Sequence, residues 1–569
     1  MFGTNLRPIR RFAPTAAAIF LSVGLCLVLD LLWLHRFRWG YPTEWDESGY
    51  LAIAVHNTNA LLDGGLASFA RVVETQPIEA PLVPAVTAPV FALFGEGMGQ
   101  GVIVILGFLA LLMVSVYGVA RQLMGRGWSV LAAFSVGALP IVTDYTRIYH
   151  FAVPAAAFLT AGLWALMRSR GLRDRRLVLL FGALVGLMLL SRTMTIGYVP
   201  GVGVAAAVLT FAGPAQRRQR VKNLLLGTLA AGAVAGLWYL RNWRSVLDYL
   251  TSAGYGSASG HFGKRPPVLS WAFWTRVLHG LTNELYLPLA ALVTACLVLG
   301  IFLAIRHART TGLGSWATSN WFILVVVVLE GYVAMTSSRN EGTAFSLPWL
   351  PALVVLAVAA AARAPQGVLK AGLATLFVVL SMANLLMKSG FVPGLSATVT
   401  AQLPGLGTTT VLHGKGIIQD DVVEASGYAP LPATKPFPDF QKRWPMFERR
   451  VVERIFDHRD RGAAVPELDG SLATESQILT NTSLNLAAAL EKKNVWVAWL
   501  RPYTDTESAY REQLTKSRAR FLITAETPTL TATLPTTLWK VERAARSLGF
   551  RNIETLTMPD GRHASLWWR

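Results

Sequence analysis

The sequence predicts a mainly α-helical, polytopic membrane protein of about 11 transmembrane helices, followed by a C-terminal extracytoplasmic α/β domain. Two observations lead to this fold class. Hydrophobic residues make up 53% of the 569 residues and charged residues only 15%, which is too apolar for an ordinary soluble protein of this size. The formal net charge of +19 lies largely in short loops between apolar runs, a distribution typical of membrane proteins and unlike a nucleic-acid-binding patch.

The apolar runs define the expected spans, because a helix needs roughly 20 apolar residues to cross a bilayer. Runs of adequate length lie at 13–34, 101–120, 128–148, 151–167, 177–194, 197–213, 223–240, 286–305, 320–336, 343–362 and 370–387. The first run follows three arginines and has no small-residue cleavage site, so we expect a retained signal anchor. The proline-rich stretch 80–95 is shorter, and we expect a helix that lies in the interface or dips into it.

The orientation of the chain follows from the basic loops. With a cytoplasmic N-terminus and a non-spanning 80–95, the cytoplasmic loops are 121–127, 168–176, 214–222, 306–319 and 363–370, and each is net basic, as the positive-inside bias requires. The C-terminus is then outside. The unusual polar residues near the membrane fall on the external face, which comprises a first external loop (35–100), the turn 144–150, the turn around Arg192, the loop 241–285, the turn 337–342 and the C-terminal tail.

From about residue 390 the composition becomes that of a soluble protein. Short apolar segments such as "TTTVLHG", "VWVAWLR", "RFLITAE" and "HASLWWR" alternate with helical patterns, which predicts a small α/β domain over 390–569 after a membrane module over 1–389. We expect 415–470 to be a loop-rich connection. The domain has no phosphate loop, metal-spacing motif or nucleophile elbow, so a rigid external cap without chemistry is the favoured interpretation. Cys26 and Cys296 lie inside apolar runs and are expected to be packing residues.

The stretch "EWDESGYLAIA" (44–54) contains the first candidate catalytic residues, Asp46 and Glu47. Adjacent residues of a helix point about 100° apart, so one carboxylate can face a site while the other orients a neighbour. A carboxylate at the edge of a low-dielectric cavity has a raised proton affinity and suits general base catalysis on a hydroxyl. The alternative is a solvated pair of acids or a charge at a helix N-terminus, and the residues alone leave both open.

Arginines near the external boundary are the second candidate set, because they run against the inside bias and each needs a partner. They are Arg147, Arg192, Arg241, Arg244 and Arg339. A phosphate ligand suits the planar guanidinium group, whereas snorkelling at the interface explains one or two of them.

The segment 241–267 is the third signal, because aromatic residues alternate there with glycines. Trp243, Tyr249 and Tyr255 can stack on a sugar ring and exclude water when a loop closes, while the alternative is a linker. Glu79 and His261, with His150 or His279, leave a divalent metal site open, although no ligand spacing supports it. No other cofactor is expected.

The ordered set of external segments resembles the GT-C class of integral-membrane glycosyltransferases that use polyprenyl-phosphate sugars. The segments that carry the resemblance are "WDESGY", "IEAPLVPAVTAPVFALFG", "DYTRIYHFAVPAAAF", "LLSRTMTIGYVPG", "WYLRNWRSVLDYL" and "SRNEGTAFSLPWLPAL". The chain is similar to bacterial proteins related to protein O-mannosyltransferases and to the lipid A aminoarabinose transferase. The resemblance covers about residues 1–390.

The resemblance implies particular roles for the candidate residues. Asp46 becomes the catalytic base with Glu47 beside it, and Arg192, Arg241 and Arg339, with Arg147, hold the donor phosphate. Two departures matter. Many members have Asp where this chain has Ala152 or Val153, and members related to the aminoarabinose enzyme have Lys where it has Ala80. The residues that can substitute are Asp144 or His150 for the acid and Arg36 or Arg38 for the lysine.

The sequence therefore predicts a glycosyltransferase of the cell membrane, acting in cell-envelope glycosylation. It moves a sugar from a polyprenyl-phosphate donor to an acceptor hydroxyl on the external face, with inversion and Asp46 as general base. The acceptor is a protein, a lipid or a polysaccharide, and no nucleic acid is involved. The alternative is a transporter or flippase for a lipid-linked anionic glycan precursor, which would place binding residues near the midplane on broken helices. A third possible function, a membrane-anchored receptor, does not explain the external arginines.

Overall fold

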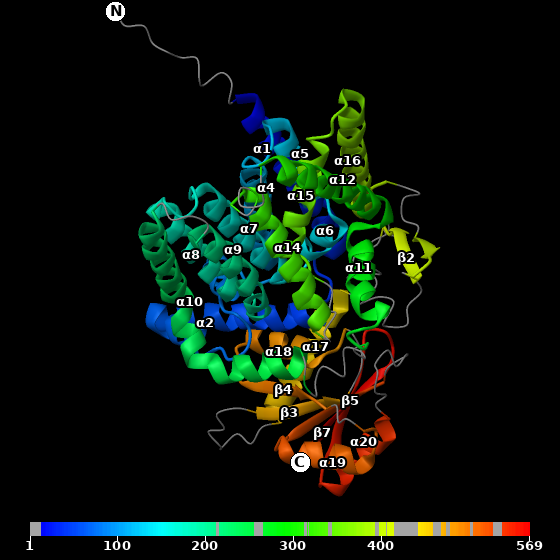
Figure 1. Ribbon diagram of the computed structural model, residues 1–569. Coiled ribbons are helices and arrows are strands. Elements are labelled where there is room, and N and C mark those ends of the chain that lie inside the picture. The colour runs from blue at the N-terminus through cyan, green and yellow to red at the C-terminus, as the bar shows by residue number, and fades with distance from the viewer. Residues whose placement is uncertain are drawn as a thin grey trace, which may run out of the picture.

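A bundle of apolar helices stands over a smaller α/β domain, and one long helix, α2 (Trp45–Thr75), lies across the end of the bundle between them (Figure 1). The computed structural model describes residues 13–211, 216–254, 256, 266–311, 316, 318–338, 344–392, 398–405, 407–414, 442–458, 468–473, 478–500, 504–526 and 537–569.

Every apolar run singled out in the sequence contains helix. The bundle comprises α1 (Ala13–Trp33), the π-helical turn η2 (Leu34–Arg38), α4 (Met98–Ala120), α5 (Arg126–Gly137), α6 (Pro140–Thr146), α7 (Ala152–Arg168), α8 (Arg175–Ser191), the 3-10 helix η3 (Thr193–Tyr198), α9 (Val199–Phe211), α10 (Arg217–Gly254), α11 (Trp271–Leu285), α12 (Leu287–Thr311), α14 (Asn320–Ser337), α15 (Leu350–Ala361) and α16 (Gly367–Lys388). The chain is thus a multi-pass membrane protein.

The described helices that are long enough to cross a membrane are fewer than the 11 expected spans. Within the described residues, seven helices are long and apolar enough to cross a membrane, or eight if α5 and α6 form one span bent by 60°. The bend falls at Pro140, because proline forces the preceding residue out of the helical region; Leu139 has an extended ψ of 136°. Helices α7, α8 and α15 have 17, 17 and 12 residues, short of a full span. Eleven spans therefore stay a prediction.

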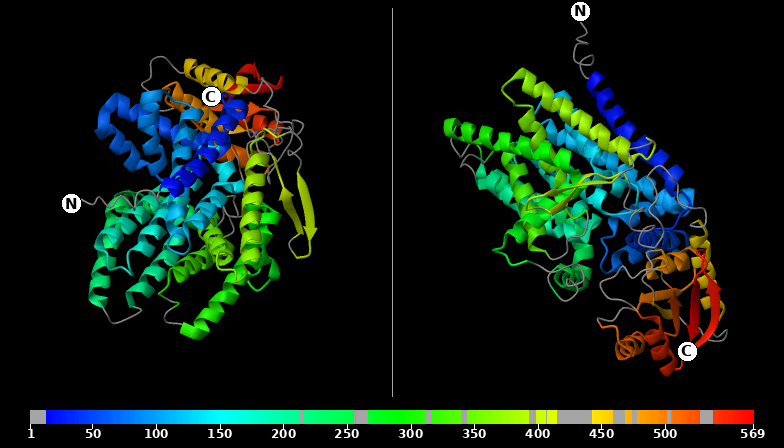
Figure 2. Two further views of the ribbon diagram at one scale, coloured as in Figure 1. Left: turned by 90° about the horizontal axis from the view of Figure 1, so that it is seen from above. Right: turned by 90° about the vertical axis from the view of Figure 1, so that its right-hand side faces the viewer.

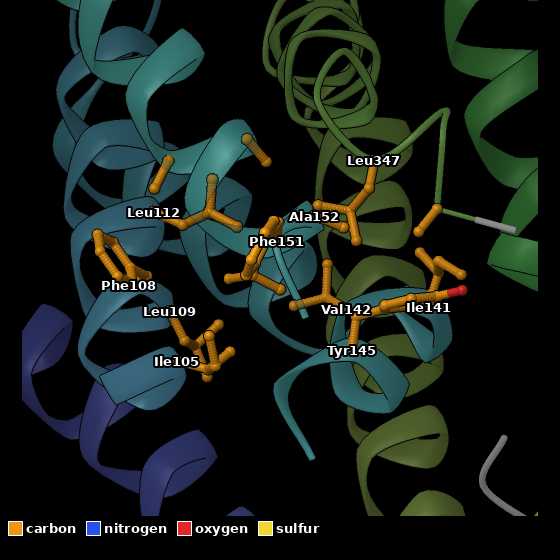
Figure 3. Packing of buried hydrophobic residues seen from close by; sticks show 14 of the residues in the cluster. Ile105, Phe108, Leu109, Leu112, Ile141, Val142, Tyr145, Phe151, Ala152 and Leu347 are labelled. Atoms are coloured by element: carbon orange, nitrogen blue, oxygen red, sulfur yellow. The ribbon is translucent and has the colours of Figure 1, made fainter. Parts of the chain in front are cut away.

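The helices pack through small residues and one apolar cluster. A Cβ atom on Gly182 would lie 1.9 Å from the carbonyl oxygen of Gly227, so α8 and α10 cross with their backbones in contact, as small residues allow in membrane bundles. In Figure 3, Phe151 lies between Phe108 and Leu112 of α4 on one side and Val142 of α6 on the other. This packing holds the turn between α6 and α7 inside the bundle.

The segment 35–100, which is expected to be external, contains two helices that are not among the candidate membrane spans. Helix α2 begins with a capping box in which Glu44 and Glu47 each accept a hydrogen bond from the other's backbone N–H, which satisfies two free donors of the first turn. It bends at Gly65, whose φ of 65° favours glycine. Helix α3 (Leu82–Phe94) has only 13 residues with Pro89 inside it, so 80–95 forms a short apolar helix, as expected from its length.

The C-terminal part has the predicted α/β character. Its five-stranded sheet has the order β4–β3–β5–β7–β6, formed by β3 (Leu468–Ala473), β4 (Val495–Trp499), β5 (Phe521–Ala525), β6 (Arg551–Thr557) and β7 (His563–Trp568). Strand β3 pairs in parallel with β4 and β5, and β7 pairs antiparallel with β5 and β6. The accompanying helices are α17 (Trp444–Asp457), α18 (Asn481–Leu490), α19 (Glu507–Lys516) and α20 (Leu538–Ser547).

Two segments before the sheet differ from the expectation. The segment "TTTVLHG" lies in a separate hairpin of β1 (Val399–Leu403) and β2 (Gly407–Leu412), which lies beside α11 (Figure 1); there the Thr410 N–H donates to Asn283 Oδ1 at 3.1 Å. The expected loop-rich connection 415–470 contains α17, which forms because its Trp444, Phe447 and Val451 make one buried face. Residues 415–441 and 459–467 of that connection lie outside the described residues.

Helix α2 joins the bundle to the α/β domain. The Thr482 hydroxyl donates to the carbonyl oxygen of Trp45 at 2.9 Å, and the Trp45 and Trp499 rings meet edge to face at 4.1 Å. Further along, Lys492 Nζ lies 3.0 Å from Asp63 Oδ1. The view turned by 90° shows the same contact between the two parts (Figure 2, right).

Candidate active site

A cavity of about 730 Å³ lies where α2, the bundle and the α/β domain meet. Its lining comes from segments that are far apart in the chain. They are the first turns of α2 (Trp45, Asp46, Gly49, Tyr50, Ala52, Ile53, His56), the segment Gln76 to Ala80, the Tyr145 and His150–Phe151 turn, Arg192 to Met194, Tyr249 with Phe345, and Asn481, Thr482, Asn485 and Trp496 of the C-terminal domain. The cavity thus collects residues that are far apart in sequence.

Asp46 lies in the first turn of α2 and lines this cavity. Its side chain is exposed to the cavity, while protein surrounds the cavity itself. Burial in this surrounding raises the pKa of Asp46, and the nearby Arg192 guanidinium partly offsets the effect by favouring the ionised form. A carboxylate in this state can accept a proton from a hydroxyl.

Glu47 points to different surroundings, as adjacent helical positions require, and it is not among the residues that line the cavity. Its carboxylate pairs with the guanidinium of Arg38, and both side chains are fully buried. The other oxygen accepts the backbone N–H of Tyr149 at 2.9 Å. Glu47 therefore ties α2 to η2 and to the turn before α7. The catalytic role expected for Glu47 has no support in this geometry, because its carboxylate contacts Arg38 and the Tyr149 N–H and does not reach the cavity.

Arg192 lies at the end of α8 and faces the cavity. One of its nitrogens donates to the carbonyl oxygen of Ala344 at 3.0 Å, and its guanidinium lies 4.3 Å from the centre of the Phe345 ring. Among the described residues, Arg192 has no ion pair within 4.0 Å. A cation held by a ring and one carbonyl retains donors for an anion.

Of the other arginines predicted to bind the donor phosphate, Arg147 and Arg241 lie away from the cavity. Arg147 is buried, pairs with Asp30 at 2.8 Å and stacks on Trp33, which makes it a packing element of the bundle. Arg241 pairs with Glu74 at 2.8 Å and is half exposed. Neither lines the cavity, because each is held by a carboxylate of its own. Arg339 lies outside the described residues.

The residues considered as substitutes are also placed. Arg38 is held by Glu47 and Asp144 by Lys388 at 2.9 Å, while Arg36 lies over the ring of Phe37, so none of the three lines the cavity. His150 does line it, with its Nδ1 accepting the backbone N–H of Ala152 at 3.1 Å. Burial and the Arg192 charge hold the pKa of His150 well below its usual range, which favours the neutral ring.

Of the predicted sugar contacts, Tyr249 lines the cavity. Trp243 lies outside the lining with 53% of its surface exposed, under Arg244, and Tyr255 lies outside the described residues. Glu79 also lines the cavity, where burial raises its pKa. His261 lies outside the described residues, and within them no three His, Cys, Asp or Glu side chains are grouped to hold a metal ion. The described part of the chain thus supports no metal site.

Several lining residues escaped the sequence analysis. Tyr50 stacks on Phe151 at 4.0 Å and faces the cavity one helical turn after Asp46, a spacing that is visible in the sequence. Gln76, Asn481 and Trp496 carry no such signal, because only the folded chain brings them to Asp46. The C-terminal domain therefore forms one wall of the cavity.

Comparisons with known proteins agree with this architecture. Residues 77–239 match the family model described as dolichyl-phosphate-mannose-protein mannosyltransferase. The chain is similar to ArnT from Cupriavidus metallidurans bound to undecaprenyl phosphate, at 15% identity over 96% of this chain and 97% of that chain, with a TM-score of 0.53. It is also similar to the archaeal oligosaccharyltransferase AglB from Archaeoglobus fulgidus in complex with an inhibitory peptide and a dolichol-phosphate, at 10% identity over 89% of this chain and 69% of that chain, with a TM-score of 0.53. No curated protein sequence matches the chain.

The resemblance noted from the sequence is thereby confirmed at the level of fold, which is that of the GT-C membrane glycosyltransferases. The segment matched by the family model includes Glu79, His150 and Arg192, three residues of the cavity lining. Asp46 lies outside the matched segment.

The buried Arg38–Glu47 pair generates a stability prediction. Glu47→Gln leaves the guanidinium buried without its counter-charge, which typically costs about 3–5 kcal/mol, so we expect a clear fall in the thermal unfolding midpoint of the detergent-solubilised protein. The double variant Arg38→Met, Glu47→Gln removes the unpaired charge and should recover part of the loss.

The matched control is Asp63→Asn, which removes the exposed partner of Lys492 and should change stability by less than about 1 kcal/mol. An unchanged midpoint in Glu47→Gln would contradict the importance of the buried pair.

Proposed function

We propose that the chain is a glycosyltransferase that moves a sugar from a polyprenyl-phosphate donor to an acceptor hydroxyl. The observation that carries the proposal is the meeting of Asp46 and Arg192 in one cavity, a base and an anion-binding group with protein around them. The similar structures support it, since one is bound to undecaprenyl phosphate and another to a dolichol-phosphate. The alternative of a transporter has no comparable support.

In the proposed reaction Asp46 takes the proton of the acceptor hydroxyl, and the hydroxyl oxygen attacks the anomeric carbon. The bond to the lipid phosphate breaks on the opposite face, so the configuration inverts. Arg192 stabilises the charge that develops on the leaving phosphate. One base suffices for a single displacement, whereas retaining glycosidases need two working carboxylates.

Glu47 and the remaining arginines have other roles in this proposal. Glu47 positions Asp46 by anchoring the start of α2 to Arg38 and to the Tyr149 backbone. Arg147 stabilises the bundle through Asp30. Arg241 and Arg339 stay predicted phosphate contacts, and Arg241 would have to leave Glu74 to act as one. The transferred sugar is a hexose or a pentose, and the acceptor is a protein, a lipid or a polysaccharide.

The proposed orientation places the cavity on the extracytoplasmic side of the cell membrane and the N-terminus in the cytoplasm. Two contacts support a common face for the basic loops. Arg363 donates to the carbonyl oxygen of Leu123 at 2.8 Å, which joins loops 363–370 and 121–127. The Asn223 amide donates to the carbonyl oxygen of Leu172 at 2.8 Å, which joins the start of α10 to loop 168–176.

Reporter fusions test this orientation. Fusions after Arg121 and Arg173 should report the cytoplasm, and a fusion after Arg569 should report the outside, because the positive-inside bias keeps the basic loops in the cytoplasm. A cytoplasmic C-terminal reporter would overturn the orientation together with the external site.

Asp46→Asn tests the base. The substitution keeps the size of the side chain but removes its proton affinity, so release of free polyprenyl phosphate from a labelled donor should fall about 10²–10⁴-fold. Donor binding should persist, because the phosphate is held by Arg192. Asp63→Asn, on the exposed part of the same helix, serves as the matched control. Near-normal turnover in Asp46→Asn would transfer the role of the base to another group.

Arg192 is tested through both affinity and pH. Arg192→Ala removes a charge-assisted contact of about 1.5–3 kcal/mol, so donor affinity should fall about ten-fold or more. Because Arg192 lowers the pKa of Asp46, its loss should also move the acidic limb of the pH–rate profile to higher pH, since the base must be ionised to act. Arg192→Lys should retain most of the pH effect but recover only part of the affinity.

The control for this prediction is Arg511→Ala, in an exposed pair of the C-terminal domain. An acidic limb that stays in place, with unchanged donor affinity in Arg192→Ala, would remove Arg192 from the site.

A further inference from the structure

Gln76 is a buried amide residue that contributes to the cavity lining. It follows the last residue of α2 and is only 9% exposed. Its backbone oxygen accepts the Trp238 indole N–H at 3.0 Å, which holds the residue in place. Its side-chain Nε2 and Oε1 have no hydrogen-bond partner among the described residues, although buried amides are nearly always paired. A ligand in the cavity is the natural partner for both atoms.

A second unpaired amide stands on the wall formed by the C-terminal domain. Asn481 is the first residue of α18 and lines the same cavity, and its Oδ1 has no partner among the described residues. The two other polar residues of α18 in the lining are hydrogen-bonded within the protein. Thr482 is bonded to Trp45, and the Asn485 amide donates to and accepts from the backbone of Val497 at 3.1 and 2.8 Å. Of the three, Asn481 alone has a side-chain atom without a hydrogen-bond partner among the described residues.

Trp496 adds an aromatic face to this wall. It occupies an outward position of β4, where the neighbouring Val495 and Val497 are buried, and 49% of its surface is exposed. Its side chain contributes to the cavity lining. Alternation along the strand therefore turns Trp496 toward the cavity, while its neighbours hold the sheet to the core.

We propose that Gln76, Asn481 and Trp496 bind a sugar ring in this cavity, so that the C-terminal domain takes part in choosing the substrate. The proposal rests on the glycosyltransferase function above. A sugar hydroxyl both donates and accepts hydrogen bonds, which matches a neutral amide with both capacities free, and the C–H face of a sugar ring packs on an indole. A phosphate would instead seek the cation Arg192. This assignment replaces the expectation that the domain is a cap without chemistry.

The sugar has two possible sources with the same chemistry, the donor and the acceptor. Binding measurements with the full-length protein separate them. The first arm compares the affinity for a polyprenyl-phosphate sugar with that for bare polyprenyl phosphate. The second arm measures the affinity for a panel of methyl glycosides in the presence of bare polyprenyl phosphate.

Gln76→Ala, Asn481→Ala and Trp496→Ala should each lower one of these sugar-dependent affinities about ten-fold, while the affinity for bare polyprenyl phosphate changes less than two-fold. A loss in the first arm assigns the site to the donor sugar, and a loss in the second assigns it to the acceptor. In the affected arm, an analogue that lacks the paired hydroxyl should bind wild type and the amide variant equally, because the lost contact no longer exists in either protein. A merely structural role would not produce that equality.

The matched controls are Gln402→Ala, an exposed amide of the β1–β2 hairpin, and Trp539→Ala, an exposed indole on α20. Both lie outside the cavity and should leave both arms unchanged. Unchanged sugar-dependent affinities in all three variants would overturn the proposal, as would equal losses for bare and glycosylated lipid. A wild-type protein that binds the sugar but transfers none would overturn the glycosyltransferase function and leave the binding proposal standing.

Discussion

The buried ion pair between Arg38 and Glu47 is the contact on which the site depends. Removing two charges from water is costly, and the pair is retained where three segments meet. Arg38 ends η2, Glu47 belongs to the capping box of α2, and its second oxygen accepts the N–H of Tyr149. The direction of α2 across the end of the bundle is set here. Because Asp46 is the adjacent residue, the same contact decides which way its carboxylate faces.

The cavity is completed from the other side by the C-terminal domain. Thr482 packs against α2 at Gly49, one turn after Asp46, where an added Cβ would lie in ordinary van der Waals contact at 3.4 Å. The contact of Trp45 with Trp499 fixes the same edge. Helix α2 carries the proposed base and also contacts the C-terminal domain. The position of that domain therefore affects the shape of the cavity.

The charged residues near the membrane fall into two groups, according to whether another protein charge pairs with them. Asp30 with Arg147, and Asp144 with Lys388, are internal pairs that neutralise charge inside the bundle, which is the usual solution for ionisable groups in an apolar surrounding. Arg192 has a ring and a carbonyl as neighbours instead, and Asp46 has the cavity. Within the described part of the chain neither has an ion pair, which is the property expected of groups that meet a ligand.

The sequence by itself determined the helices, the division into an apolar and a soluble part, and several groups of the cavity, among them Asp46, Arg192 and Tyr249. Those features depend on local composition, on charge placed against the membrane bias and on a recognisable order of segments. Only the tertiary structure decided that Glu47, Arg147 and Arg241 face other partners, and that Gln76, Asn481 and Trp496 share a cavity with Asp46. A charged residue looks the same in sequence whether a counter-charge more than a hundred positions away pairs with it, as Asp30 does with Arg147, or leaves it to a ligand. That choice is made by packing.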